Sequence, residues 1–147
     1  MVPADRRRMR KDKAQQARRR RGDEWEQALA AGLDAAGWAK CWPRGWAGQP
    51  WDISATVEGH SYAIECKRIA RGNLGYSAFT ANEVENLSRH EDAGGISVVA
   101  ILRDAPYTVR FVPWYAIRAD VLGGGRGSVK LELYPENLIE VLEIIRK

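Results

Sequence analysis

Apolar and polar residues alternate along two short runs within residues 50–70, one on each side of Glu58-Gly59. Such alternation is typical of β-strands, and a two-residue turn containing glycine between two alternating runs predicts a β-hairpin. A turn at Glu58-Gly59 fixes the strand register and places Asp52 directly opposite Glu65. The pattern therefore predicts that two carboxylates from neighbouring strands meet at the open end of a hairpin.

Side chains alternate between the two sides of a strand, so the two faces of this hairpin differ in composition. One face is almost entirely apolar and is expected in the core; it holds Trp51, Ile53, Ala55, Val57, Tyr62, Ile64 and Cys66. The other face is small and polar, with two carboxylates and an ammonium group crowded together; it holds Asp52, Ser54, Thr56, Ser61, Ala63, Glu65 and Lys67.

The rest of the chain predicts further helices and strands. Apolar stripes of helical period bounded by capping residues predict helices, and the apolar run ISVVAIL predicts a strand buried on both faces. We expect helices from Glu24 (capped by Asp23) to Gly37, from Thr80 to Gly94, over 113–122 and over 138–146, and strands within 38–49 and over 96–102, 107–112 and 128–134. These elements predict an α/β fold with a central mixed β-sheet flanked by helices.

The basic residues are concentrated at the start of the chain. Residues 1–21 contain ten Lys and Arg against two Asp, a net charge of +8, whereas the remainder has a net charge of −4. This segment has too few apolar residues to fold alone, and its charge suits contacts with phosphate. We therefore expect a basic, flexible arm over 1–21 and a folded domain over 22–147. The alternative is a merely solvated tail.

The crowded carboxylates indicate a chemistry. Two carboxylates held together repel each other unless a cation lies between them, and oxygen ligands of this kind suit Mg²⁺. A lysine beside them can orient a metal-bound water and neutralise charge on a phosphate. The residue types thus predict metal-assisted phosphodiester hydrolysis. The alternative is an ordinary strand face with a Glu–Lys surface pair.

The same residues carry a resemblance. Asp52 followed by Glu65-Cys66-Lys67 resembles the D…ExK signature of the PD-(D/E)XK nuclease superfamily, and the order of elements over 22–117 resembles its Holliday junction resolvases, of the archaeal Hjc and bacterial RecU types. There is no room before Asp52 for the stalk of RecU, which favours the Hjc type. One departure is Trp51, which separates Pro50 from Asp52 where many members have the two adjacent. The resemblance implies a restriction-endonuclease-like fold.

The resemblance also implies roles for residues. Asp52, Glu65 and the backbone carbonyl of Cys66 are implied as ligands of Mg²⁺, for which Mn²⁺ can substitute, and Lys67 as the residue that orients or activates the attacking water. In the resembling resolvases the first helix carries a glutamate four residues after a glycine. Glu26 matches this spacing and is implied as a catalytic residue that supports the metal site.

Two assignments stay open at this level. Glu24 is the alternative to Glu26 at the metal, and Glu26 could instead close a capping box at the start of its helix. The resembling resolvases have a glutamine near position 83 that helps to complete the site. Here the residue is Glu83, which is either an extra acidic group in the cleft or only a helix cap, and we favour the cap.

The carboxylates predict a metal-dependent nuclease, and the resemblance implies an Mg²⁺-dependent endodeoxyribonuclease that resolves four-way junctions. Branched DNA with two-fold symmetry, cut on two strands, favours a homodimer. Three tryptophans, Trp38, Trp42 and Trp46, could pack in the core or stack on DNA bases, and at least two of them are expected in the core or at a dimer interface. The expected DNA contacts come from the arm and from the loop after the ExK strand: Arg18, Arg19, Arg20, Arg21, Arg68 and Arg71. The alternatives are a related restriction, repair or phage nuclease and a non-catalytic DNA-binding relative.

Other classes of function find no support in the sequence. The loop GGGRG at 123–127 lacks the Lys-Ser/Thr ending of a phosphate-binding loop, so no nucleotide cofactor is expected. The two cysteines and two histidines lack the spacing of a zinc site. No apolar run is long enough to cross a bilayer, and the basic start lacks a secretion signal. We expect a cytoplasmic protein of a prokaryotic, archaeal or phage-infected cell.

Overall fold

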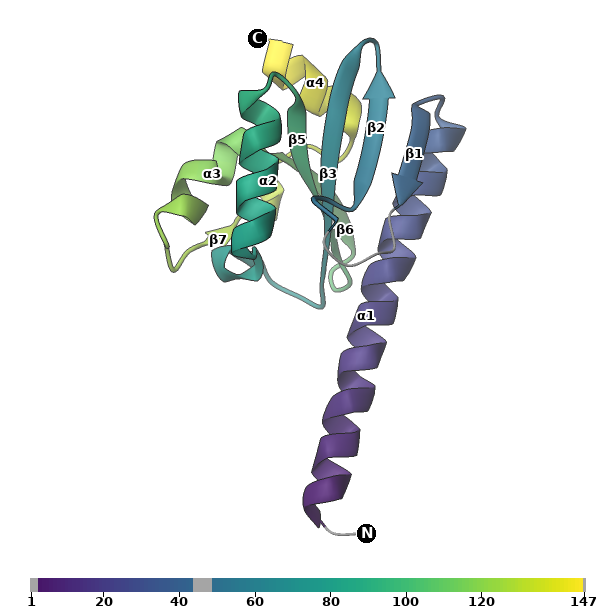
Figure 1. Cartoon of the computed structure of the whole chain (residues 1–147), viewed down its shortest axis with the longest axis vertical. Helices are drawn as coiled ribbons and strands as arrows, with labels where there is room; N and C mark the ends of the chain where they lie inside the picture. Colours follow the sequence, from purple (N-terminus) through teal and green to yellow (C-terminus); the bar gives the residue numbers. More distant parts are fainter. Residues whose placement is uncertain (1–2, 44–48, 147) are drawn as a thin grey trace.

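A five-stranded mixed sheet forms the centre of the protein, seen in a computed structural model that describes residues 3–43 and 49–146 (Figure 1). The strand order is β1-β2-β3-β5-β6. Strands β3 and β5 are parallel, and every other neighbouring pair is antiparallel. The strands are β1 (Ala39–Pro43), β2 (Ile53–Val57), β3 (His60–Ile69), β5 (Ile96–Arg103) and β6 (Thr108–Pro113). The predicted α/β fold with a mixed sheet flanked by helices is confirmed.

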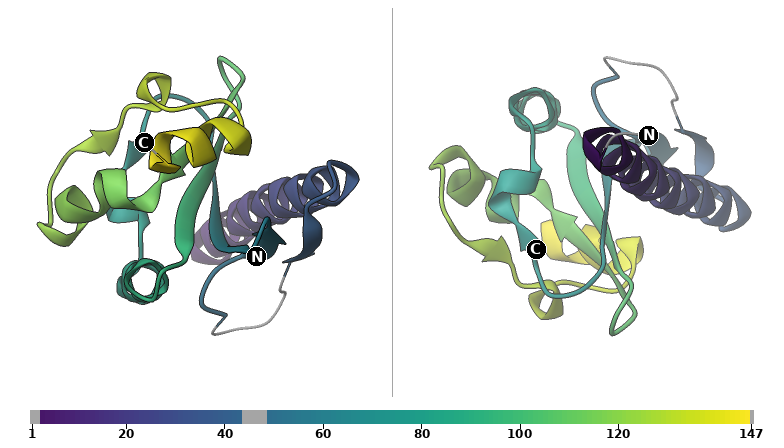
Figure 2. Two further views of the ribbon diagram at one scale, coloured as in Figure 1. Left: turned by 90° about the horizontal axis from the view of Figure 1, so that it is seen from above. Right: turned by 90° about the horizontal axis from the view of Figure 1, so that it is seen from below.

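Helices cover both faces of this sheet (Figure 2). Helices α1 and α4 pack on one face and α2 and α3 on the other, so that each face has its own apolar cluster. The helices are α1 (Pro3–Ala35), α2 (Ala81–Asp92), α3 (Trp114–Leu122) and α4 (Leu138–Arg146). A second, two-stranded sheet pairs β4 (Leu74–Gly75) with β7 (Ser128–Val129), and two short 3₁₀ turns are η1 (Tyr76–Ala78) and η2 (Leu131–Leu133).

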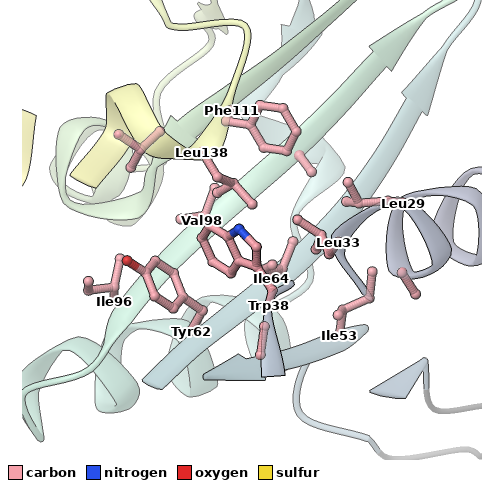
Figure 3. Close-up of a cluster of buried hydrophobic side chains, with 14 of the residues drawn as sticks. Leu29, Leu33, Trp38, Ile53, Tyr62, Ile64, Ile96, Val98, Phe111 and Leu138 are labelled. Carbon is pink, nitrogen blue, oxygen red and sulfur yellow. The ribbon is translucent and has the colours of Figure 1, made fainter. Parts of the chain in front are cut away.

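The cluster under α1 and α4 fixes the first helix against the sheet. Figure 3 shows Leu29 and Leu33 of α1 packed beside strand residues such as Ile53 and Ile64. The indole Nε1 of Trp25, on the same apolar stripe, donates a hydrogen bond of 3.1 Å to the Ala100 carbonyl of β5. Burial of three large side chains on one stripe supplies the tertiary packing that a helix needs in order to persist.

The hairpin has the predicted register. Val57 pairs with His60 around a turn at Glu58 and Gly59, whose φ angles are 51° and 79°. The ladder ends at Ile53, one residue after Asp52. The expected faces are only partly correct: Ala63 is fully buried beneath α2 and α3, and Trp51 packs with this second cluster rather than with the first. Because residues 50–52 lie in bends outside β2, the strict alternation does not extend back to Trp51.

The first helix does not begin at Glu24, and that prediction is wrong. Helix α1 starts at Pro3 and continues through the basic segment without interruption. Arg, Lys, Ala and Gln are strong helix formers, and elongation from the packed half of the helix adds one hydrogen bond per residue. The basic arm is therefore helical, with its charged side chains exposed. The division into an arm over 1–21 and a nuclease domain over 22–147 stays a prediction.

The remaining elements agree with the sequence except near the C-terminus. The predicted strand over 128–134 is shorter, because only 128–129 is strand and η2 follows. Trp38 lies in the core, with its ring 4.9 Å from that of Tyr62. The expectations for Trp46 and for the side chain of Trp42 lie outside the described residues. Within the described part of the chain, no helix has the length and apolar character to cross a membrane.

Candidate active site

Asp52 and Glu65 meet at the end of the hairpin, as the register predicts. The Asp52 backbone N–H donates to the Ile64 carbonyl (3.1 Å), which extends the strand pairing by one step. The Asp52 side chain then turns onto β3, where its Oδ2 accepts a hydrogen bond from the Cys66 backbone N–H (2.8 Å). The same carboxylate is hydrogen-bonded to the Glu65 side chain. Backbone geometry therefore forces the two carboxyl groups together.

The Glu65 carboxyl group is almost fully enclosed, with only 6% of the residue exposed. Its pKa is raised from 4.5 to about 10, first by burial and then by the charges of Asp52 and Glu83, against a smaller lowering by Lys67. Without a metal ion, Glu65 holds a proton at neutral pH, and this proton lets it share a hydrogen bond with Asp52. A cation bound between the two groups would take the place of that proton.

Glu26 is a residue of α1 whose charge interacts with that of Asp52. It is partly buried, and its pKa is raised to about 7 by burial, by the Asp52 charge and by Asp23. Glu24 lies elsewhere: its side chain is 61% exposed and its Oε2 is 3.8 Å from Nη1 of Arg68. A capping role for Glu26 is excluded because its helix begins at Pro3. Of the two glutamates considered for the metal site, Glu26 is thus the one coupled to Asp52.

Lys67 lies beside Glu65 but is held mainly by other groups. Its Nζ is 3.9 Å from Glu65 Oε1, and it donates at 2.8 and 3.1 Å to the two carboxylate oxygens of Glu83 and at 3.1 Å to the Ala78 carbonyl. It also lies 5.4 Å from the centre of the Phe79 ring. The strand thus presents one acid and one amine on the same side, two residues apart, as the ExK spacing requires.

Glu83 caps its helix as predicted, but this is only part of its role. Thr80 Oγ1 accepts from the Glu83 backbone N–H (3.1 Å), and Glu83 Oε2 accepts from the Thr80 backbone N–H (3.4 Å), which is a capping box. The same carboxylate contacts Lys67 and adds to the charges that raise the pKa of Glu65. The two alternatives left open by the sequence are therefore not exclusive.

Gln49 also contacts the site and was not among the residues expected there. Its Nε2 donates to Asp52 Oδ1 (3.1 Å), and its buried Oε1 has no hydrogen-bond partner among the described residues. Together with the Cys66 N–H, this amide leaves Asp52 with a donor on each carboxylate oxygen. An amide three residues before the acidic residue was the only sequence signal for this contact.

The donor set fits Mg²⁺ in one specific sense. No group of three or more His, Cys, Asp or Glu side chains within the described residues is arranged to hold a metal ion. Mg²⁺ commonly uses one or two carboxylates together with water and substrate phosphate, rather than an all-protein cage. Asp52 and Glu65 supply such a pair of hard oxygen ligands.

The Cys66 thiol faces the first apolar cluster, and its pKa is raised well above its usual value, mainly by burial.

Arg68 was expected in the loop after the ExK strand, but it lies within β3, which continues to Ile69. Its side chain lies close to arginines at the end of the arm. Arg18, Arg21 and Arg68 line a hollow of about 390 Å³ with Asp104. Arg68 is fixed there by Asp104 (3.0 Å from Nε, 2.9 Å from Nη2) and by the Arg21 carbonyl (2.9 Å). Arg19, Arg20 and Arg71 are exposed. Arg18, Arg21 and Arg68, which come from two predicted DNA-contact regions far apart in sequence, therefore line one hollow, called the basic surface below.

Comparison with known proteins found similarity among solved structures. No protein-family model matches the chain, and no curated protein matches it. Among solved structures, the chain is similar to Hjc, a Holliday junction resolvase from the archaeal hyperthermophile Archaeoglobus fulgidus. The two are 30% identical with a TM-score of 0.49, over 63% of this chain and 72% of that one.

Proposed function

We propose that this protein is an Mg²⁺-dependent endonuclease that resolves four-way DNA junctions by hydrolysis of a phosphodiester bond. The observation that carries the proposal is the pairing of Asp52 with a buried Glu65, with Lys67 on the same strand face. Two carboxyl groups held this close repel each other when both are ionised, which destabilises the fold unless a cation binds between them. Such an arrangement is typical of a site that binds a cation. The choice of a four-way junction follows the resemblance in sequence stated above.

Each residue has a proposed task. Asp52 and Glu65 would hold the metal, joined by the Cys66 carbonyl, and the bound ion, Mg²⁺ or Mn²⁺, would supply an activated water and charge stabilisation at the phosphate. Lys67 would orient the attacking water and offset charge on the transition state. Glu26 would accept hydrogen bonds from metal-bound water, a role supported by its electrostatic coupling to Asp52. Gln49 would keep the Asp52 carboxylate in place.

The basic surface would hold the DNA backbone. The hollow is lined by Arg18, Arg21 and Arg68, and Arg68 follows Lys67 directly in β3, so a phosphate held there would bring the DNA backbone to the strand that carries Lys67. Arg68 is already fixed by Asp104, which reduces the entropy lost on contact with phosphate. A C2 homodimer would present two such sites to the two strands of a junction that must be cut.

The test compares substrates and metal conditions. Purified protein is incubated with a synthetic four-way junction and with a linear duplex of the same sequence, in Mg²⁺ and in EDTA. We expect cleavage of the junction in Mg²⁺ only. Glu65→Gln should abolish it, whereas Glu85→Gln, at an exposed position on α2, should not. Equal cleavage of duplex would favour a related nuclease with another target, and binding without cleavage in any metal would favour the non-catalytic relative.

A further inference from the structure

The position of the Lys67 amine depends on groups outside its own strand. A lysine carries a compact charge on a flexible four-carbon chain, so its location is set by what the ammonium contacts. Here the acceptors within hydrogen-bond distance are both Glu83 oxygens, in the first turn of α2, and the Ala78 carbonyl, at the end of η1. The Glu65 carboxylate, on the same strand as Lys67, is farther away at 3.9 Å.

The distances at Glu83 show which of its two contacts orients the carboxylate. Its capping contact to the Thr80 N–H is 3.4 Å, long for an N–H···O hydrogen bond. Its contacts to Lys67 are 2.8 and 3.1 Å and join two charged groups, the kind of hydrogen bond that is short and about twice as strong. The carboxylate is therefore placed by Lys67 more than by the helix cap. The other half of the cap, from the Glu83 N–H to Thr80 Oγ1, does not involve the Glu83 side chain.

We propose that Glu83 is a positioning residue, which holds the Lys67 amine beside Glu65 and prevents it from closing onto that carboxylate. The role rests on the proposed nuclease function, in which Lys67 acts on the attacking water. Without Glu83 the ammonium would lose its nearest partner and move toward the next acid, Glu65. Glu65 would then be paired with an amine, and Lys67 would be displaced from the water.

The test separates positioning from capping. Glu83→Ala removes the contact with Lys67 and half of the capping box, whereas Thr80→Val removes only the other half of the box. We expect Glu83→Ala to lower kcat for junction cleavage on the order of 10- to 100-fold, the cost of a small misplacement of a catalytic group. Junction affinity should not change. Thr80→Val should cleave as wild type does, and Glu83→Gln, which keeps an acceptor oxygen, should recover part of the loss.

A double-mutant cycle tests whether Glu83 acts through Lys67. In a Lys67→Ala background, Glu83→Ala should cause no further loss, because its target is already gone. Independent losses that multiply would overturn the proposal. So would equal effects of Glu83→Ala and Thr80→Val, which would make Glu83 only a cap, or wild-type cleavage by Glu83→Ala.

A second measurement does not depend on cleavage. In metal-free protein, the rate at which Lys67 reacts with an acylating reagent can be followed by peptide mass spectrometry. We expect a several-fold faster reaction in Glu83→Ala, because the amine loses its closest partner, and no change in Thr80→Val. Unchanged reactivity in Glu83→Ala would refute the contact itself. If wild-type protein cleaves no DNA but this difference is found, the proposed function fails and the positioning of Lys67 stands.

Discussion

Replacement of Glu65 by glutamine should change how the stability of the metal-free protein depends on pH. The pKa of Glu65 is raised from 4.5 to about 10, chiefly by burial. Between these pH values the folded protein keeps a proton that the unfolded chain has released. The free energy of unfolding therefore falls as the pH rises, by up to about 1.4 kcal/mol per pH unit, and the stabilisation is complete only below pH 4.5.

Glutamine has the shape of the protonated acid and no proton to lose. Glu65→Gln should therefore lack this dependence and become more stable than wild type as the pH rises. Between pH 6 and pH 8 the difference in unfolding free energy should move in favour of the variant by about 3 kcal/mol, as an upper value. Glu26, with its pKa raised to about 7, titrates in both proteins and contributes equally to both curves.

Urea denaturation in EDTA at pH 6, 7 and 8, followed by tryptophan fluorescence, measures this difference. Glu85→Gln is the matched control, because its side chain is exposed and should leave the wild-type slope unchanged. Parallel curves for Glu65→Gln and wild type would refute the reasoning, since they would mean that Glu65 ionises normally in the fold. Added Mg²⁺ should flatten the wild-type curve, because a cation held by Asp52 and Glu65 replaces the proton.

Other predictions concern cleavage, the arm and assembly. Asp52→Asn should slow cleavage about a thousandfold or more with little change in junction affinity, since it alters the metal site and not the basic surface; near-normal single-turnover rates would contradict this. Deletion of residues 1–21 should reduce the slope of log affinity against log salt concentration by about 0.9 per lost phosphate contact, and the melting temperature should not change. Identical slopes for the full-length and truncated proteins would mean that the arm does not contact DNA. Ala14→Pro should weaken junction binding at constant charge, because an interior proline costs a helix about 3 kcal/mol, and wild-type affinity would show that helical structure of the arm is not needed. Light scattering should report a dimer, and a monomer even with bound junction would argue against one.

The hairpin could be predicted because its information is local. Glu58-Gly59 forms a turn with positive φ at both residues, and a fixed turn determines every pair along the ladder, including the approach of Asp52 to Glu65. The alternation of apolar and polar residues along the hairpin was less informative about which side chains are buried. A small residue such as Ala63 on the polar face is compatible with solvent or with a packed helix, and the sequence does not indicate that α2 covers it.

Contacts between distant segments could not be predicted in the same way. Glu83 reaches Lys67 across a connection whose path depends on the packing of α2, so the sequence could not decide between a place in the cleft and a capping role, and the cap was favoured. The start of the first helix was placed wrongly for a different reason: the composition of residues 1–21 is typical of disorder, whereas the helical form of residues 3–21 follows from continuity with a segment anchored by Trp25. Composition predicts how a segment behaves in isolation, whereas residues 3–21 continue a helix whose second half is packed on the sheet.

The continuity of α1 gives the arm a defined reach. From Pro3 to Gly22 the helix is about 30 Å long at 1.5 Å per residue, and it projects beyond the rest of the molecule (Figure 1). The Arg21 carbonyl at its base is held by Arg68, one residue after Lys67. Laid along a duplex, 30 Å corresponds to about nine base pairs at 3.4 Å each. The helix would then set a minimum length of duplex for full contact. In a junction whose arms are shorter than this length, the N-terminal end of the helix would have no phosphates to contact.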